Sequence, residues 1–380
     1  MICMTKLANL DRVTGRREFM GALSLGFLAM TELGQAADDQ VIAFTDARPF
    51  NPQAPNLPWD QLATMTPNEQ MFFVKHYDYP TVDMNAWKLD IGGLVSKPQA
   101  LTLDALKARP RKEATLLLEC SGNPATGGLI GNCKWTGTPL APLLKEAGLK
   151  PEATDVVFFG WDTGAEKLGN ADYKMNFGRD LTMADALRDD VLLAWDMNGK
   201  PLEDRHGAPL RLVVPGWYGV AWVKYLTRIE VHDRPYQNRF MARDYVTLRG
   251  EKHGDDIVWR ETLVGKMNVK SVPARVVKPA SGSLRVEGAA WSDGTPLKTV
   301  EVKIDDGPWK PATIQSNGGN NHTWSFWSYD WSDAMPGDHT VSSRATDAKG
   351  AVQPAPDDPL ITMKKTRWEN NQWAVRKIKI

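Results

Sequence analysis

Short strand-like and helix-like patterns alternate from residue 87 to about residue 231. Alternating apolar and polar positions indicate a strand with one buried face, and a continuous apolar run indicates a strand covered on both faces. These patterns predict strands at 87–91, 114–118, 191–195 and 209–215, with a turn at 197–200. Helices are predicted at 102–106, where Thr102 can cap the first turn, and at 181–187. The proline-rich stretch 38–70 is expected to be an extended lead-in.

The pattern changes after about residue 270, where short strands recur at regular spacing with little helix. Residues 300–304 alternate between apolar and charged side chains and are followed by the turn 305–307. Trp324, Phe326 and Trp331 mark the next strand pair, and 340–345 lead into another turn. This arrangement predicts a β-sandwich of the immunoglobulin type. No cysteine pair crosses it, so it would lack the antibody disulfide.

Residues 1–36 have the pattern of an export signal. The pair Arg16-Arg17 precedes a short apolar run at 21–30 and the small-residue site Gly34-Gln35-Ala36. This order is typical of a twin-arginine signal, which carries folded, often cofactor-loaded proteins to the bacterial periplasm. The apolar run is too short to cross a bilayer, so no membrane anchor is expected. The alternative is an amphipathic N-terminal helix of the mature protein, but the polar stripe of such a helix is missing.

Composition narrows the classes of function. The chain has 380 residues, which predicts two or three domains. Lys plus Arg and Asp plus Glu are both 46, and this balance disfavours a nucleic-acid binder. The three cysteines are too few for a disulfide scaffold, and the sequence has no Cys-x-x-Cys-His haem motif and no flavin fingerprint.

Cys120 is the strongest candidate for chemistry. It follows the buried strand 114–118 and begins a small polar turn, so its thiol is expected at the carboxyl end of a strand. Three roles are open for it: a metal ligand, a catalytic nucleophile, or an inert core cysteine. No neighbouring His offers a base, and a zinc site would need further ligands. A disulfide between Cys120 and Cys133 is a further alternative in an oxidising compartment.

Five motifs occur together in an order and spacing that resemble the sulfite oxidase family of molybdenum enzymes. They are Glu119-Cys120-Ser121-Gly122-Asn123, Trp135-Thr136-Gly137, His206-Gly207-Ala208-Pro209-Leu210-Arg211, Val223-Lys224 and Arg243-Asp244-Tyr245. The resemblance implies an α+β fold: a mixed α/β molybdopterin-binding domain at 37–270 and an all-β immunoglobulin-like dimerisation domain at 271–380. A homodimer is expected on the same ground.

The resemblance also implies a mononuclear molybdenum–molybdopterin cofactor and roles for particular residues. Cys120 matches the thiolate ligand of the metal, and Tyr245 matches an active-site hydroxyl. Lys75 stands near the place of an anion-binding arginine, or Val74 does if the alignment has a one-residue gap. Cofactor contacts are implied for His76, Asp162, His206, Arg211, Trp222, Val223 and Lys224. Singly, each of these residues could equally be an ordinary packing or surface residue.

The implied reaction is oxidation of sulfite to sulfate by oxo transfer, with electrons leaving to an external acceptor such as cytochrome c. The chain departs from the family at two anion-binding arginines, since Pro124-Ala125-Thr126 follows Asn123 where one is expected. Lys75, Arg205 or Arg243 are the candidates to replace them. A second hypothesis keeps the cofactor but takes another sulfur substrate, as in sulfane sulfur dehydrogenases. A third is a non-enzymatic binding protein whose sandwich recognises a partner.

Overall fold

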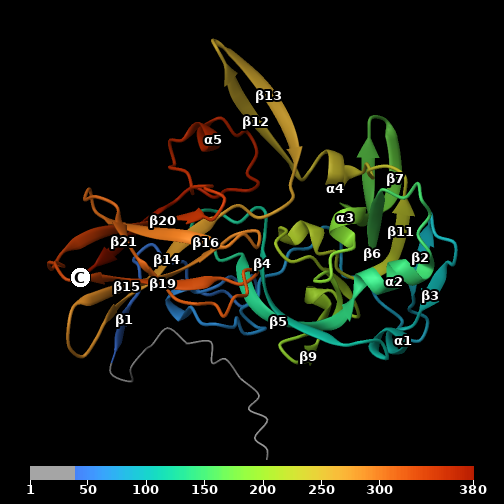
Figure 1. Cartoon of the computed structure of the whole chain (residues 1–380), viewed down its shortest axis with the longest axis horizontal. Helices are drawn as coiled ribbons and strands as arrows, with labels where there is room; N and C mark the ends of the chain where they lie inside the picture. The colour runs from blue at the N-terminus through green and yellow to red at the C-terminus, as the bar shows by residue number, and fades with distance from the viewer. Residues whose placement is uncertain (1–38) are drawn as a thin grey trace, which may run out of the picture.

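The computed structural model describes residues 39–380, so the predicted export signal at 1–36 lies outside the described residues. The described chain is mostly β, with a first lobe built from β2 to β11 and a sandwich built from β1 and β14 to β21 (Figure 1). Its α-helices have only four to eight residues. The first lobe therefore contains less helix than the expected α+β fold implies.

One sheet of the first lobe has the strand order β10-β8-β5-β4, with β9 paired to β8. Its strands are β4 (Lys112–Glu119), β5 (Ile130–Pro139), β8 (Leu192–Met197), β9 (Lys200–Pro201) and β10 (Arg211–Val213). All pairs in this sheet are antiparallel. The predicted strands 114–118, 191–195 and 209–215 fall on β4, β8 and β10, and the predicted turn at 197–200 joins β8 to β9. Leu116, Leu117 and Leu118 are buried, so this part of β4 is covered on both faces as expected.

The other sheet of the first lobe has the order β3-β2-β11-β6-β7. Its strands are β2 (Leu89–Gly93), β3 (Gln99–Leu101), β6 (Asp155–Leu168), β7 (Ala171–Thr182) and β11 (Leu226–His232). Only β11 and β2 run parallel, and the prediction of a strand near 87–91 is confirmed by β2.

Short helices lie between strands along the described chain. They are α1 (Leu103–Lys107), α2 (Leu140–Ala147), α3 (Met183–Ala186), α4 (Arg239–Ala242) and α5 (Pro359–Thr362), with 3-10 turns at Trp59–Gln61, Asp204–His206 and Gly219–Ala221. Thr102 caps α1 as predicted, because its hydroxyl accepts a hydrogen bond from the Ala105 amide at 3.2 Å. The helix predicted at 181–187 is wrong at its start. Leu181 and Thr182 end β7, and only Met183–Ala186 are helical, because pairing with β6 holds the first two residues extended.

The predicted sandwich is present as two packed antiparallel sheets. One has the order β1-β14-β15-β19-β18 and the other β17-β16-β20-β21. The strands are β1 (Gln40–Ile42), β14 (Lys270–Lys278), β15 (Leu284–Trp291), β16 (Leu297–Ile304), β17 (Lys310–Pro311), β18 (Thr313–Ile314), β19 (Ser325–Trp331), β20 (Asp338–Asp347) and β21 (Val375–Lys379). Val276, Val300, Trp327 and Val341 belong to their shared core. The N-terminal strand β1 pairs with β14 and so joins this sandwich.

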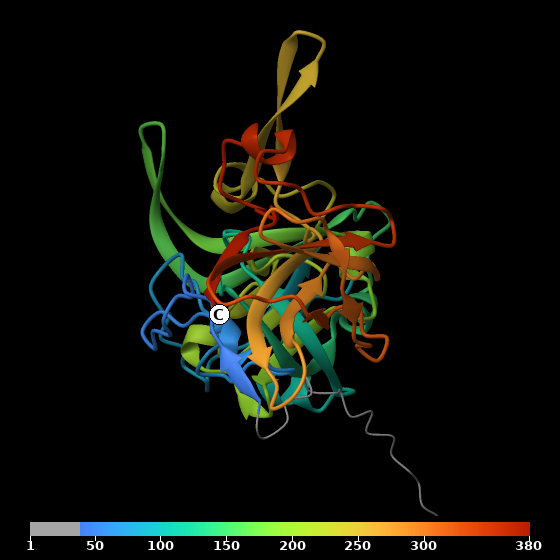
Figure 2. The same cartoon turned by 90° about the vertical axis from the view of Figure 1, so that its left-hand side faces the viewer.

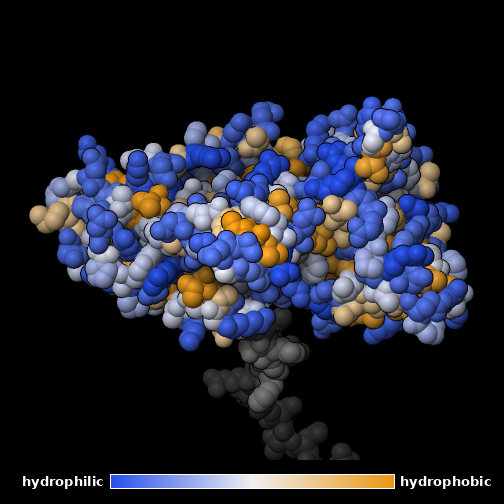
Figure 3. Space-filling view, turned by 90° about the horizontal axis from the view of Figure 1, so that it is seen from above, coloured by the Kyte–Doolittle hydropathy of each residue, from blue (hydrophilic) through white to orange (hydrophobic). Residues whose placement is uncertain are grey.

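Two long hairpins rise from the same side of the molecule, and both Figure 1 and Figure 2 show them. They are β6–β7 and the pair β12 (Val246–His253) and β13 (Asp256–Leu263), whose β13 side chains are all exposed. The sequence pattern does not predict β12 and β13, because an exposed hairpin lacks the buried face that creates a period of two. Seen from above, the surface is mostly hydrophilic with small separate apolar patches (Figure 3). Within residues 39–380 no helix has the length and apolar character needed to cross a lipid bilayer.

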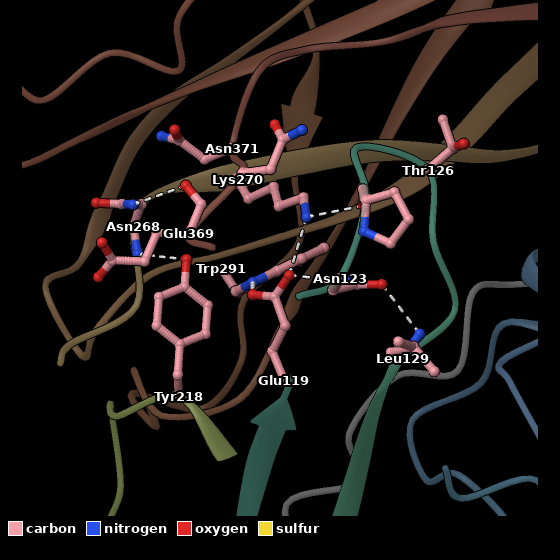
Figure 4. Close-up of polar contacts among 12 residues, drawn as sticks. Glu119, Asn123, Thr126, Leu129, Tyr218, Asn268, Lys270, Trp291, Glu369 and Asn371 are labelled. Atoms are coloured by element: carbon pink, nitrogen blue, oxygen red, sulfur yellow. Dashed lines mark hydrogen bonds and ion pairs between the residues drawn. The ribbon is translucent and has the colours of Figure 1, made fainter. Parts of the chain in front are cut away.

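A buried ion pair joins the two lobes at the end of β4 (Figure 4). Lys270 Nζ on β14 lies 2.9 Å from Glu119 Oε1, and the two side chains are 0% and 1% exposed. Trp291 Nε1 donates to Glu119 Oε2 at 2.8 Å, and Asn123 Nδ2 donates to Oε1 at 3.0 Å. Lys270 also donates to the Pro124 carbonyl at 3.2 Å. Both carboxylate oxygens therefore have partners, which is the condition under which a buried charge is tolerated.

We predict that Lys270→Met destabilises the protein by about 3–5 kcal/mol, because it leaves the Glu119 carboxylate buried without its counter-charge. Urea denaturation followed by tryptophan fluorescence measures the loss. The matched control is Arg111→Met, which removes one half of the exposed Arg111–Glu113 pair and should cost less than about 1 kcal/mol. Equal losses for the two variants would contradict a structural role for the buried pair.

Candidate active site

A cavity opens in the first lobe at the end of β4. It lies among the loop 72–76, the turn after Glu119, the 3-10 turns at 204–206 and 219–221, and the start of β12. Eight of the ten residues singled out in the sequence line it: His76, Cys120, Asp162, His206, Arg211, Trp222, Lys224 and Tyr245. The fold thus brings together residues that are spread over 170 positions of the chain.

Two of the ten do not line the cavity. The Lys75 side chain is half exposed, pairs with Asp78 at 3.0 Å and lies over the ring of Tyr79. Its neighbours Val74 and His76 line the cavity, whereas the Lys75 side chain turns outward to its partners Asp78 and Tyr79. Lys75 is therefore not placed to bind an anion beside Cys120. Val223 is buried, and its carbonyl accepts from the Leu212 amide at 2.8 Å, which holds the cavity segment 222–224 against β10.

The turn after β4 presents Cys120. The Cys120 amide donates to the Leu129 carbonyl at 2.9 Å, and the Asn123 amide donates to the Cys120 carbonyl at 2.9 Å. The Asn123 side chain then closes the turn, since its Oδ1 accepts from the Leu129 amide at 3.0 Å. These bonds fix the direction of the thiol, which faces the cavity. Burial raises the pKa of the Cys120 thiol above its ordinary value.

Cys133 is a core residue of β5. Its side chain is fully buried, and its Sγ lies 3.6 Å from the Thr66 carbonyl. Burial raises the pKa of the Cys133 thiol to about 12. Both cysteines are free, so the alternative of a Cys120–Cys133 disulfide is wrong. Among residues 39–380 no three His, Cys, Asp or Glu side chains cluster in a way that could hold a metal.

Tyr245 and His76 form a hydrogen-bonded pair beside the thiol. The Tyr245 hydroxyl lies 2.6 Å from His76 Nε2. The imidazole stacks on Phe177 with ring centroids 4.4 Å apart, and the edge of Phe240 closes its other side. Burial, with smaller effects of Lys224, Arg239 and Arg179, lowers the pKa of His76 to about 3. Burial also raises the pKa of Tyr245, so near neutral pH both groups are uncharged and the phenol can donate its proton to the imidazole.

Another part of the cavity wall is rich in cations. The fully buried Arg211 donates to the carbonyls of His206 at 3.0 Å and Trp222 at 3.2 Å. Lys224 Nζ donates to the Arg205 carbonyl at 3.1 Å, and burial lowers the pKa of Lys224 to about 7. Burial likewise lowers the pKa of His206 to about 3 and raises the pKa of Asp162 to about 6. Gly207 lets Lys224 approach, since a Cβ there would lie 2.8 Å from the Lys224 Cβ.

Four buried polar atoms that belong to lining residues have no hydrogen-bond partner within the described chain. They are Ser121 Oγ, Asp162 Oδ1, His206 Nε2 and Arg211 Nε. Leaving such an atom unpaired costs about 1–3 kcal/mol, and native proteins rarely leave several in one place. The set contains donors and an acceptor, so a polar ligand that carries both kinds of group would satisfy it.

Several lining residues were not anticipated from the sequence, among them Phe73, Phe177 and Val220. A second unexpected contribution comes from the end of the chain. The Trp368 ring stacks on Tyr245 with centroids 4.5 Å apart, and the Glu369 amide donates to the Ser121 carbonyl at 2.7 Å. Ser121 was visible within the cysteine motif, but no local signal marks Trp368, because its neighbours in the site lie more than 120 positions away.

Comparisons with known proteins identify the family to which this chain is related. Residues 76–240 match the model of the oxidoreductase molybdopterin binding domain. The chain is 30% identical to sulfite oxidase of Gallus gallus over 357 residues, covering 84% of this chain and 75% of that protein. It is 31% identical to mitochondrial sulfite oxidase of Drosophila melanogaster over 342 residues, covering 81% of this chain but only 58% of the relative.

A solved structure supports the same relationship. The sulfane dehydrogenase SoxCD from Paracoccus pantotrophus superposes with a TM-score of 0.72 and 29% identity, covering 86% of each chain. The likeness therefore spans both lobes and goes beyond the molybdopterin-binding region. From the shared sequence, the matching fold and the residues gathered in the cavity, we conclude that this chain belongs to the sulfite oxidase family of molybdopterin-dependent oxidoreductases.

Proposed function

We propose that this protein oxidises sulfite to sulfate at a molybdenum centre held beside Cys120. The observation that carries the proposal is the combination, in one cavity, of a free thiol, the Tyr245–His76 pair and a cation-rich end with unpaired polar atoms. The chain spans 58% of the Drosophila melanogaster relative and 75% of the Gallus gallus one.

The residues present fit the cofactor of this family. A pterin offers both hydrogen-bond donors and acceptors, which suits the unpaired atoms of Asp162, His206 and Ser121. A phosphate is an anion that the buried Arg211 and the neighbouring Lys224 can neutralise. A soft thiolate at Cys120 suits a metal whose other ligands are also sulfur. When bound, the molybdenum centre supplies the two-electron redox chemistry and the oxygen atom that is transferred.

The chain itself contributes position and proton placement. The turn after Glu119 holds the Cys120 sulfur in one direction. Burial favours the protonated thiol, so Cys120 would have to give up this proton to act as a metal ligand. In the tautomer with an unprotonated Nε2, the neutral His76 accepts from Tyr245, and this bond holds the phenol oxygen at the cavity wall. Phe72, Phe73 and Phe177 line the walls and limit the entry of water. These functions are orientation, desolvation and electrostatic tuning.

Export, electron transfer and assembly complete the proposal. Arg16-Arg17 and the apolar run that follows support twin-arginine export to the periplasm. The sequence lacks a haem attachment motif, which favours an external acceptor such as a cytochrome c. The C-terminal sandwich is the proposed surface for a homodimer.

A second candidate substrate is favoured by one observation. The structural relative is described as a sulfane dehydrogenase, and this chain, as noted, lacks an arginine after Asn123. The same cofactor site would then act on a sulfane sulfur carried by a larger molecule. Steady-state kinetics separate the two. If sulfite is the substrate, we expect its KM to be no higher than the usual enzymatic range of about 1 µM to 1 mM. Slow turnover that does not saturate with rising sulfite concentration supports the sulfane alternative.

We predict that Cys120→Ser loses molybdenum and lowers sulfite-dependent reduction of cytochrome c by more than about 100-fold. Loss of groups that merely support metal ligands costs about 10–100-fold, and loss of the ligand itself should cost more. Metal analysis and turnover measure the two effects. Cys133→Ser is the control, because Cys133 lies in the core and does not line the cavity. This variant protein should keep its molybdenum. A Cys120→Ser protein with full metal content and activity would refute the proposed role.

We also predict a pH dependence that reports on Lys224. Its pKa falls from 10.5 in the unfolded chain to about 7 in the cofactor-free fold, so between these values the unfolded state binds more protons. Stability of the cofactor-free protein should therefore rise with pH across this window and decline as pH falls toward 7. Melting temperatures measured from pH 7 to 10 test this.

Two comparisons make the pH test specific. Lys224→Met should remove the rise, and the exposed Lys97→Met should retain it. Protein loaded with cofactor should show a smaller rise, because a bound phosphate keeps Lys224 charged. An unchanged pH profile in Lys224→Met would show that Lys224 does not titrate in this window.

A further inference from the structure

The loop that carries His76 is anchored to the β6–β7 hairpin. Tyr77, the next residue, donates from its hydroxyl to Glu166 Oε1 on β6 at 2.6 Å. The Tyr77 ring lies against β6 at Gly164, where an added Cβ would collide with the ring. Glycine at this position therefore gives the ring the room to reach Glu166. On the neighbouring strand, Phe177 stacks on the His76 imidazole, so one hairpin contacts both aromatic residues of the loop.

The segment that carries Tyr245 is anchored to the same carboxylate through Arg239 of α4. Arg239 Nη1 donates to Glu166 Oε1 at 2.5 Å, and Arg239 Nε donates to Asp244 Oδ2 at 2.7 Å. Asp244 directly precedes Tyr245, and α4 lies beside β7 (Figure 1). One oxygen of Glu166 therefore accepts two hydrogen bonds, one from each of the two segments that carry the Tyr245–His76 pair.

These contacts close a ring. Each member is joined to the next by a peptide bond or by a hydrogen bond, and the members in order are His76, Tyr77, Glu166, Arg239, Asp244 and Tyr245. Only His76 and Tyr245 of this set line the cavity. The other members lie behind the cavity wall, where they can fix the distance between the phenol and the imidazole without touching a ligand.

The ring is charged behind the cavity wall and neutral where it meets the cavity. Glu166 is buried, and although burial opposes the effect, hydrogen bonds from Tyr77 and Arg239 hold the pKa of Glu166 below its ordinary value. The bond to Glu166 in turn raises the pKa of Arg239. The ion pair is therefore intact near neutral pH, where His76 and Tyr245 are both uncharged. Hydrogen bonds between charged groups are stronger than neutral ones, so this pair is the firmest link of the ring.

We propose that Glu166 and Arg239 are positioning residues that hold the Tyr245 phenol and the His76 imidazole in the geometry that substrate oxidation requires. They act through Tyr77 and Asp244 and do not contact the substrate. The proposal rests on the proposed function and deepens it, because it names residues outside the cavity on which the active-site hydroxyl depends. Misplacing a reacting group by about 1 Å can lower a rate by about 100-fold, so the effect of such residues is measurable.

The test compares variants of the molybdenum-loaded protein. Glu166→Ala and Arg239→Met each open the ring, and their double variant opens it at both places. Glu166→Gln removes the charge but keeps a hydrogen-bond acceptor. Glu230→Ala is the matched control, because Glu230 pairs with Arg228 at 2.7 Å on the adjacent strand β11 and neither of these residues lines the cavity.

Two readouts are combined. Steady-state kinetics give kcat and KM for sulfite, with kcat expressed per bound molybdenum. Fluorine NMR of protein labelled with 3-fluorotyrosine reports on the environment of each phenol, and the signal that is lost in Tyr245→Phe is that of Tyr245. This second readout does not depend on turnover, and an ion pair that only stabilised the fold would leave the Tyr245 signal unchanged.

We expect Glu166→Ala and Arg239→Met each to lower kcat about ten- to a hundredfold with a smaller change in KM, because neither side chain touches the substrate. Both variants should shift the Tyr245 signal and keep their molybdenum. Glu166→Gln should recover part of the loss. The double variant should lose little more than either single one, since both substitutions open the same ring. Glu230→Ala should match the wild-type kinetics within about twofold and keep the Tyr245 signal.

The outcomes separate this inference from the proposed function. An unchanged Tyr245 signal and kcat in Glu166→Ala overturn the positioning role, as does a lowered melting temperature with kcat unchanged. Additive losses in the double variant also overturn it. A Tyr245 signal that depends on Glu166 and Arg239, in an enzyme that does not oxidise sulfite, supports the positioning of the pair and overturns sulfite as the substrate.

A milder variant carries the test if Glu166→Ala folds poorly. Tyr77→Phe removes a single hydroxyl and keeps the ring that packs at Gly164, so it breaks one hydrogen bond of the ring without removing the ion pair. It should shift the Tyr245 signal in the same direction and lower kcat by a smaller factor. A Tyr77→Phe protein with both quantities unchanged would overturn the proposal.

Discussion

The active site depends on one buried ion pair. Glu119 ends β4 and is almost completely excluded from water, so its charge requires Lys270 and its second oxygen requires Trp291. Both partners come from the sandwich, while Asn123 supplies the remaining contact from the turn itself. A carboxylate held on all sides cannot rotate without breaking bonds in a low-dielectric interior. The residue that follows it, Cys120, therefore leaves the strand in a single direction.

The cavity beside this turn lowers the folding stability of the ligand-free protein, and a bound ligand can offset that loss. Burial disfavours the charged forms of Lys224 and Arg211, and several polar atoms nearby have no partner within the described chain. Such a site lowers the stability of the empty fold and gains stability when an anion with matching donors and acceptors binds. The arrangement accordingly ties the molybdopterin cofactor of this family to the stability of the protein as well as to its chemistry.

The two lobes are not independent in function. The first lobe provides the thiol, the Tyr245–His76 pair and the cations, and the sandwich provides Lys270 and Trp291 behind the thiol. The segment 364–369 then returns from the sandwich to the front of the cavity, where Trp368 stacks on Tyr245. A substitution in the C-terminal hundred residues can thus act directly on the site. The contacts of this region with the cavity go beyond a role in dimerisation alone.

The sequence by itself determined the local features and the family. The apolar run before Cys120 predicted β4, Thr102 predicted the start of α1, and Asn198-Gly199 predicted a hairpin turn, since each depends on neighbours in the chain. Only the tertiary structure decided which side chains meet. It turned Lys75 outward, kept Cys133 in the core, added β1 to the sandwich and brought Trp368 to Tyr245. These outcomes depend on packing between segments far apart in sequence, and the hydrophobic period of one segment carries no information about the partner that covers it.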